Sequence, residues 1–486
     1  MAEQSLKDKT LKGVGWSMAD AFLGRGITFI VGIVLARLLT PSEYGLIGIT
    51  TIFVSVLDAI VDSGFSQALI RKKDATKDDY NTMFITNMVL SVLMFLALFF
   101  SAPAIARFFN RPELVSLNRV MGSVLIINAL SITQYTVLTK RIDFKTKTKA
   151  SVFSAVLSGI IGISMAFMGF GVWALVGQQL SKQFINTICL WILNKWWPNF
   201  SFSKESFNYM WGFGWKMLAS SLLNNIWRQL YQVVVGKCYS PATLGQYSKS
   251  KEYSTIFSAN IDLIVNRVSY PVLSEIQNNS TRLTSAYRKI IKTTMFVTAV
   301  CMVSMGAVAE PLIYCLIGPQ WHEAATYLPL ICISMSLYPL HSINLNMLKV
   351  QGRSDLYLVL EILKKIIAIG PICVGMFIDI YWMVASSVVT GIIAYFLNSH
   401  YSGKLIGYSS WMQIKDIAPS YGLSFLIAVS VYFLKYLPLS YWIILPMQII
   451  VGTIVFFLVC KVLKNEEYVQ VKEMVMTFIG KLNKSK

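Results

Sequence analysis

The segment "ARLLTPSEYGLIG" (36–48) returns two hundred residues later as "GKCYSPATLGQYS" (236–248). In each copy a hydroxyl residue precedes a proline, and a glycine follows four residues after that proline. The repeat therefore predicts that one helix–turn–helix unit occurs twice in the chain.

Composition places this unit in a membrane. The 486 residues are 55% hydrophobic and 14% charged, whereas a soluble domain carries about 25% charged residues. The segments 83–106 and 150–181 contain no charged residue. Since about 20 apolar residues cross the hydrocarbon of a bilayer, the sequence predicts an all-α polytopic membrane protein.

Hydropathy and turn residues predict about fourteen transmembrane helices. The motifs "GVWALV" (171–176) and "IYWMVA" (380–385) repeat at a similar offset to the opening pair. An even number of helices per copy gives two parallel six-helix repeats around a central cavity, followed by two extra helices. The predicted helices cover 13–37, 44–66, 83–106, 114–138, 150–168, 171–193, 208–236, 244–267, 291–316, 324–348, 356–378, 380–402, 417–434 and 440–460. The predicted domains are an N-lobe (1–195), a cytoplasmic linker (196–207), a C-lobe (208–404), helices 13 and 14 (405–464) and a tail (465–486).

The net charge of +19 is concentrated in alternate loops. The segments "RKKDATK" (71–77), "KRIDFKTKTK" (140–149), "RLTSAYRKIIK" (282–292) and the C-terminal tail carry most of it. This distribution follows the positive-inside rule and argues against nucleic acid as the partner. It predicts that both termini are cytoplasmic, and the polar, basic N-terminus does not resemble a cleavable signal peptide.

Ionisable residues within the predicted helices are costly in hydrocarbon and are candidate functional groups. They concentrate in the first two helices of each half, which can line a central cavity. The basic members can hold an anionic head group, and the acidic members can balance them or take a coupling cation. The candidate substrate-binding residues are Arg25, Lys216, Arg228, Lys249, Lys251 and Arg267. The candidates for ion coupling or charge balance are Asp20, Asp58, Asp62, Glu252 and Asp262.

Structural roles compete with these functional ones. Asp20 can pair with Arg25. Glu361 and Lys365 are four residues apart, which is the spacing of an intrahelical ion pair. The seven cysteines fall in or beside apolar segments without metal-ligand spacing, so we expect them to pack as small apolar residues and expect no metal site. Two interpretations of the tail remain open: a helix with an apolar face that lies on the membrane or caps the inner side of the protein, and a solvated charged segment. That face comprises Val471, Val475, Phe478 and Leu482.

Other functions make different demands on the sequence. A membrane enzyme that builds polysaccharide should carry a long outer loop with catalytic carboxylates or histidines, and every predicted outer loop is short. A cation-coupled exporter of small amphiphilic molecules remains the alternative to a carrier of anions, but it should have acidic cavity helices. A structural scaffold leaves the buried charges unexplained.

Four motifs of the first half are distinctive: "GWSMADAFLGRGITFIVGIVLARLLTPSEYGLIGI" (15–49), "SGFSQALIR" (63–71), "TKRIDFK" (139–145) and "GFGVWALV" (169–176). Together they resemble the polysaccharide transporter family of the multidrug/oligosaccharidyl-lipid/polysaccharide (MOP) superfamily, and in particular its Wzx-like lipopolysaccharide, colanic-acid and teichuronic-acid flippases.

This resemblance implies a flippase that moves undecaprenyl-diphosphate-linked oligosaccharide across the bacterial cytoplasmic membrane by alternating access. It implies a lipid-linked oligosaccharide and membrane lipids as partners, a polysaccharide polymerase and chain-length machinery as further ones, and no cofactor. Energy is expected from the membrane potential, H⁺ or Na⁺. Arg25 matches the cationic residue that such flippases carry in the first helix, and Asp20 stands where drug exporters of the superfamily often carry a coupling acid.

Overall fold

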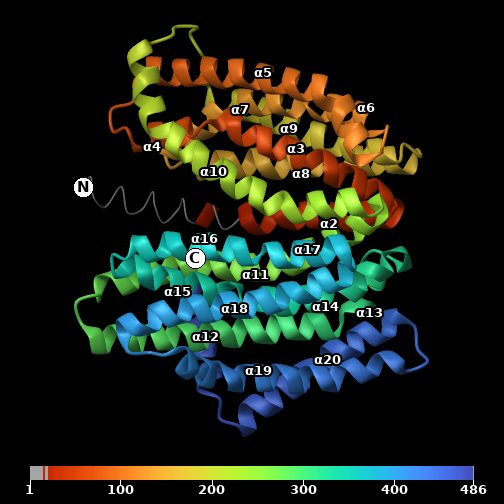
Figure 1. The fold of residues 1–486 in the computed structure, drawn as a ribbon, viewed down its shortest axis with the longest axis vertical. Coiled ribbons are helices and arrows are strands. Elements are labelled where there is room, and N and C mark those ends of the chain that lie inside the picture. The colour runs from red at the N-terminus through yellow and green to blue at the C-terminus, as the bar shows by residue number, and fades with distance from the viewer. Residues whose placement is uncertain (1–14, 17–19, 485–486) are drawn as a thin grey trace. The chain divides into compact units, whose positions relative to one another are not determined.

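The computed structural model describes residues 15–16 and 20–484, and helices are the only regular secondary structure in this part of the chain. The all-α fold class is therefore confirmed. The chain divides into two compact units, Met1–Gly245 and Gln246–Lys486 (Figure 1). The boundaries predicted for the lobes, the linker and the tail remain predictions.

In the first unit, α8 packs along α9, and α7 lies between α5 and α9 (Figure 1). Small residues allow the close packing of α8, because Gly159 and Gly162 are in contact with side chains of α2 and α9. The helices of this unit are η1 (Asp20–Gly24), α2 (Arg25–Leu38), α3 (Pro41–Asp62), α4 (Phe65–Arg71), α5 (Lys77–Phe109), α6 (Leu114–Met121), α7 (Ser123–Lys140), α8 (Phe144–Phe167), α9 (Val172–Asn194) and α10 (Lys204–Cys238). Helix α11 (Pro241–Glu275) begins in this unit and continues into the second.

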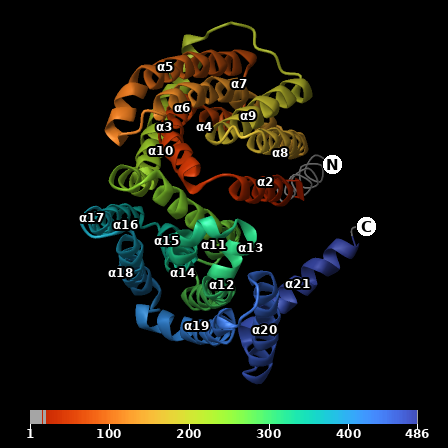
Figure 2. The ribbon, with the colours of Figure 1, turned by 90° about the vertical axis from the view of Figure 1, so that its right-hand side faces the viewer.

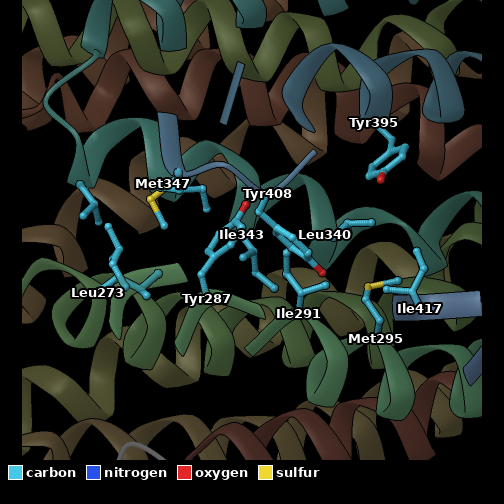
Figure 3. Packing of buried hydrophobic residues seen from close by; sticks show 13 residues of the cluster. Leu273, Tyr287, Ile291, Met295, Leu340, Ile343, Met347, Tyr395, Tyr408 and Ile417 are labelled. Carbon is cyan, nitrogen blue, oxygen red and sulfur yellow. The ribbon is translucent and has the colours of Figure 1, made fainter. Parts of the chain in front are cut away.

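In the second unit, α12 packs against α14 and α19, and α19 packs against α20 (Figure 2). Its core lies between α12, α15 and α18, where Tyr287 and Tyr408 are buried among aliphatic side chains (Figure 3). The Tyr287 hydroxyl donates to Oδ1 of Asn344 at 2.9 Å, so its polar end is satisfied. The helices are α12 (Ser280–Ala307), α13 (Ala309–Leu316), η2 (Pro319–Trp321), α14 (His322–Ser336), α15 (Tyr338–Val350), α16 (Ser354–Ile367), α17 (Ile369–Phe377), α18 (Ile380–Ile406), α19 (Ser410–Tyr432), η3 (Phe433–Tyr436), α20 (Tyr441–Val462) and α21 (Glu466–Lys484).

Within the described residues, nine helical segments are long and apolar enough to cross a membrane. Each of the fourteen predicted ranges overlaps a helix or two consecutive helices. The range 114–138, for example, is divided into α6 and α7 at Gly122. A multi-pass membrane protein is confirmed, and the number of fourteen crossings stays a prediction. The beginning of the first predicted helix, residues 13–14 and 17–19, lies outside the described residues.

The repeated turn begins a helix in both copies. Thr40 caps α3, where its backbone N–H donates to the Glu43 carboxylate at 2.7 Å and its hydroxyl accepts from the Glu43 N–H. At the start of α11, the Ser240 hydroxyl accepts from the Thr243 N–H at 3.1 Å. Helix capping thus explains the order of hydroxyl residue and proline that the two copies share.

The glycines of the two turns are explained by a close approach inside the first unit. A Cβ placed on Gly45 would lie 1.8 Å from the carbonyl oxygen of Pro241. A Cβ placed on Gly245 would lie 2.0 Å from the carbonyl oxygen of Pro41. The two copies of the turn therefore face each other, and each glycine accommodates the backbone of the other copy.

The segment between α9 and α10 is non-helical but well anchored. The Asn199 N–H donates to the Asn81 side chain at 3.1 Å, and the Ser203 N–H donates to the Thr82 hydroxyl at 3.0 Å. The Trp196 ring packs edge-on against Phe84 of α5. This segment is fastened to α5 within the first unit.

The C-terminal tail forms helix α21, whose first turns are docked on α12. Lys292 pairs with the Glu467 carboxylate at 3.0 Å, and the Thr293 hydroxyl donates to the Gln470 side chain at 3.1 Å. Val471 packs against the apolar cluster formed by α12, α19 and α20. The side chains of the other three residues of the predicted apolar face, Val475, Phe478 and Leu482, lie outside the described residues.

Candidate functional site

The first group of polar side chains surrounds α2. Arg25 begins this helix and is exposed. One turn further, the Thr28 hydroxyl accepts a hydrogen bond from Nζ of Lys182 at 3.0 Å. Lys182 comes from the middle of α9 and is half-buried. A second cation therefore lies one turn from Arg25, on a helix for which the sequence predicted no functional residue.

Gln183, which follows Lys182 in α9, begins a chain of hydrogen bonds that reaches α3. Nε2 of Gln183 donates to Oδ1 of Asn128 at 2.7 Å. Nδ2 of Asn128, from α7, donates in turn to the carboxylate of Asp58. We call Thr28, Lys182, Gln183, Asn128 and Asp58 the polar belt, because they connect α2, α9, α7 and α3 through side chains. In hydrocarbon such groups are stable only when they satisfy one another.

The other two acids of the first half lie in different surroundings. Asp20 is close enough to interact electrostatically with Lys147 and Lys182. Asp62 accepts a hydrogen bond from the Ser66 hydroxyl at 2.6 Å, on the neighbouring helix α4. The candidates predicted in the first two helices are three acids and Arg25. Helices α8 and α9 bring two further cations, Lys147 and Lys182, near Asp20.

Helix α10 carries the basic candidates Lys216 and Arg228, and both side chains are exposed. The guanidinium of Arg228 donates to Oδ1 of Asn225. The adjacent Gln229 donates to the hydroxyl of Ser55 in α3 at 3.0 Å. Since Ser55 lies one turn before Asp58, this contact places the Arg228 segment of α10 beside the part of α3 that joins the polar belt.

The candidates of α11 within the second unit do not form a single basic cluster. Lys249 is buried and pairs with the Glu252 carboxylate at 2.9 Å. Nζ of Lys251 lies 5.9 Å from the centre of the Tyr247 ring. Arg267 is exposed and lies more than four turns further along the helix. Lys249 and Glu252 therefore balance each other, whereas Arg267 is separate from them.

Asp262 belongs to a second polar network, built from α11 and α15. Its carboxylate is hydrogen-bonded to the side chains of Ser342 and Asn266. Asn346 of α15 donates to Oδ1 of Asn266. The equivalent repeat positions Asp62 and Asp262 thus both bind hydroxyl groups, but on different neighbouring helices.

Glu361 forms an ion pair as expected, although the partner differs from the predicted one. Its carboxylate binds Nζ of Lys364, three residues on, where the sequence predicted Lys365. Both spacings lie on one face of a helix, so periodicity alone does not decide between them.

Replacing Asn128 tests the polar belt directly. Asn128→Leu leaves both Asp58 and Gln183 without a shared partner, and an unsatisfied buried polar group costs about 1–3 kcal/mol. We expect the melting temperature of the detergent-solubilised protein to fall by several degrees.

The double variant Asp58→Leu, Asn128→Leu is the matched control, since it removes the donor and the acceptor together. It should recover part of the lost stability. An Asn128→Leu protein as stable as the wild type would show that the belt contributes nothing to folding.

Long apolar helices that enclose chains of amides, carboxylates and lysines define a polytopic membrane protein with a polar interior. The chain belongs to the polysaccharide biosynthesis protein family, whose model matches residues 34–326. It is 25% identical over 364 residues to the succinoglycan biosynthesis transport protein ExoT of Rhizobium meliloti (strain 1021), which covers 75% of this chain and 74% of ExoT. It is 27% identical over 355 residues to the teichuronic acid biosynthesis protein TuaB of Bacillus subtilis (strain 168), which covers 72% of this chain and 73% of TuaB.

Among solved structures, the lipid II flippase MurJ in an inward closed conformation shares the fold. The two superpose with a TM-score of 0.72 at 15% sequence identity, over 93% of this chain and 98% of MurJ. The family therefore agrees with the resemblance drawn from the sequence motifs, and the solved structure shows the same fold.

Proposed function

We propose that this protein is a flippase that moves undecaprenyl-diphosphate-linked oligosaccharide from the cytoplasmic to the outer leaflet of the bacterial cytoplasmic membrane, as a step in the synthesis of O-antigen, capsule or exopolysaccharide. The observation that carries this proposal is the polar belt with its cation Lys182, one turn from Arg25, in a member of a polysaccharide biosynthesis family. It is a transporter, and its action requires no bond to be made or broken.

The physical task is to move a diphosphate and a sugar through hydrocarbon while the polyprenyl tail stays in lipid. A cation 4 Å from a phosphate oxygen contributes about 4 kcal/mol at an effective dielectric constant of about 20, before desolvation. Arg25 and Lys182 can therefore replace part of the hydration that the diphosphate loses. Lys216, Arg228, Lys251 and Arg267 are the further cations proposed to meet the substrate, since each has a side chain that is at least partly exposed.

The acids have a different role in this proposal. Asp20 lies near Lys147 and Lys182 and balances their charge, whereas Asp58 is held by the amide of Asn128. Both acids limit the net charge of the empty carrier. H⁺ or Na⁺ coupling through these acids would add to the driving force. The basic loops orient the protein with both termini in the cytoplasm, where a polysaccharide polymerase and chain-length machinery are its proposed functional neighbours in the membrane.

A membrane potential that is negative on the cytoplasmic side should drive the transport. Each negative charge that moves fully outward gains about 2.3 kcal/mol per 100 mV. We expect liposomes with an imposed potential of this sign to flip lipid-linked oligosaccharide faster than liposomes without one, at the same pH gradient. An ionophore that collapses the potential alone is the control, and an unchanged rate would exclude voltage as a driving force.

Deletion of the gene in its native host tests the proposed function. We expect undecaprenyl-diphosphate-linked oligosaccharide to accumulate in a form that enzymes added outside spheroplasts cannot reach, while surface polysaccharide is lost. Accumulation of the same intermediate on the outer leaflet would instead place the protein after the flipping step. Resistance to amphiphilic drugs that depends on the gene, with normal surface polysaccharide, would favour the exporter alternative.

A further inference from the structure

A cavity of about 350 Å³ lies in the second unit, where the first turns of α19, the last turn of α20 and the start of α21 come together beside α12 (Figure 2). Helices α12, α19 and α20 are each long and apolar enough to cross a membrane. The cavity is therefore at the end of the membrane-spanning segments, which is the depth of lipid head groups. Its charged lining residues are Lys292, Lys415, Asp416, Lys464, Glu466 and Glu467.

Two of the three acids in this lining are already neutralised. Glu467 pairs with Lys292 at 3.0 Å. Asp416 is bound by two nitrogens of the Arg288 guanidinium, one of them at 2.6 Å. Lys415 and Lys464 are exposed, and neither forms an ion pair with any described carboxylate. When Arg288 is counted with the lining residues, four cations face three acids, which leaves an excess of one positive charge around the cavity.

The position of Lys464 is fixed by the turn that joins α20 to α21. Lys464 adopts the left-handed conformation with φ 46°, and the following N–H of Asn465 donates to the Cys460 carbonyl at 3.1 Å. The Asn465 side chain then caps α21 by accepting from the Tyr468 N–H at 2.7 Å. The positive end of the α21 dipole thus adds to the field of the two lysines.

The remaining wall of the cavity is apolar. Leu423 and Cys460 are buried in the seam between α19 and α20, and Leu463 is 64% exposed beside them. The cavity has cations at its rim and an apolar wall along membrane-spanning helices. A phospholipid requires both features, since the cations can bind its phosphate and the wall can contact an acyl chain. A free phosphate would meet the cations but leave the apolar wall uncovered.

We propose that this cavity binds an anionic glycerophospholipid, with its phosphodiester between Lys415 and Lys464 and an acyl chain against Leu423 and Leu463. The bound lipid would link α19 to the turn before α21 and so help to hold the C-terminal helix in place. The site does not depend on what the protein transports, nor on which face of the membrane it occupies.

Native mass spectrometry of the full-length protein in detergent measures this binding. Phosphatidylglycerol is titrated against phosphatidylcholine with the same acyl chains, and glycerol phosphate is added as the soluble head group. The test variant is Lys415→Gln, Lys464→Gln, and the control variant is Lys461→Gln, Lys472→Gln, which removes two exposed lysines that do not line the cavity. Size-exclusion profiles and melting curves confirm that both variants are folded.

We expect the wild type and the control variant to prefer phosphatidylglycerol, and the test variant to bind it about tenfold more weakly. Binding of phosphatidylcholine should be equal in all three proteins. If the test and control variants bind phosphatidylglycerol equally weakly, the proposed site is wrong, because net charge alone would then explain the preference for this lipid. If glycerol phosphate displaces the lipid at a similar concentration, the site binds a free phosphate group, and the proposal of a lipid ligand is wrong.

Discussion

Lys182→Met is expected to slow the transport of lipid-linked oligosaccharide by about 10- to 100-fold while the protein remains folded. The substitution removes a cation that lies one turn from Arg25 and bonds to Thr28, and hydrogen bonds to charged groups contribute about 1.5–3 kcal/mol. Methionine retains the length and flexibility of the lysine side chain, so the packing around residue 182 should be largely preserved. The measurement is the initial flipping rate in liposomes reconstituted with equal amounts of each protein.

Lys73→Met is the matched control, because Lys73 is an exposed lysine of the same unit, in the loop after α4. It should flip at the rate of the wild type, and Lys182→Arg should recover part of the activity. If Lys182→Met flips as fast as the control, the cation of α9 has no contact with the substrate.

Gly45→Val is expected to destabilise the protein by at least about 3 kcal/mol, near the upper end of the cost of overpacking. The clash is with a backbone carbonyl at 1.8 Å, which has no flexible end that could move away. We expect little folded protein to be recovered in detergent, and a much lower melting temperature for the part that is recovered. Gly245→Val should behave in the same way, since its Cβ meets the carbonyl of Pro41.

Gly212→Ala provides the comparison, because a Cβ at Gly212 in α10 meets nothing within 4 Å. Its melting temperature should equal or slightly exceed that of the wild type, as alanine favours a helix over glycine. A Gly45→Val protein with the same melting temperature as this control would mean that the two turns do not approach each other as described.

The sequence predicted the helices well because long apolar runs are local signals. The helices predicted to start at residues 44 and 244 begin three residues earlier in the structure, at Pro41 and Pro241, where the Thr40 and Ser240 hydroxyls cap them. It did not predict why the glycines recur. That reason is a contact between turns two hundred residues apart, which no local pattern contains.

The candidate site was predicted less completely. Asp58 was found because a carboxylate in an apolar helix is conspicuous, but its partners Asn128 and Gln183 are uncharged amides that hydropathy overlooks. Lys182 was available to the same argument as Asp58, since it lies near the middle of the range predicted for the sixth helix. The prediction covered only the first two helices of each half, whereas in the structure Lys182 reaches from α9 to Thr28 of α2.

Reconstitution of the purified protein in liposomes tests the central claim most directly. The substrate is undecaprenyl-diphosphate-linked oligosaccharide extracted from the native host, and the readout is the fraction of sugar that an enzyme in the opposite compartment reaches with time. We predict transport by the wild type and a rate at least about tenfold lower for Arg25→Ala, with unchanged folding. A wild-type rate no higher than that of protein-free liposomes, in preparations that transport an amphiphilic cation, would contradict the assignment as a flippase.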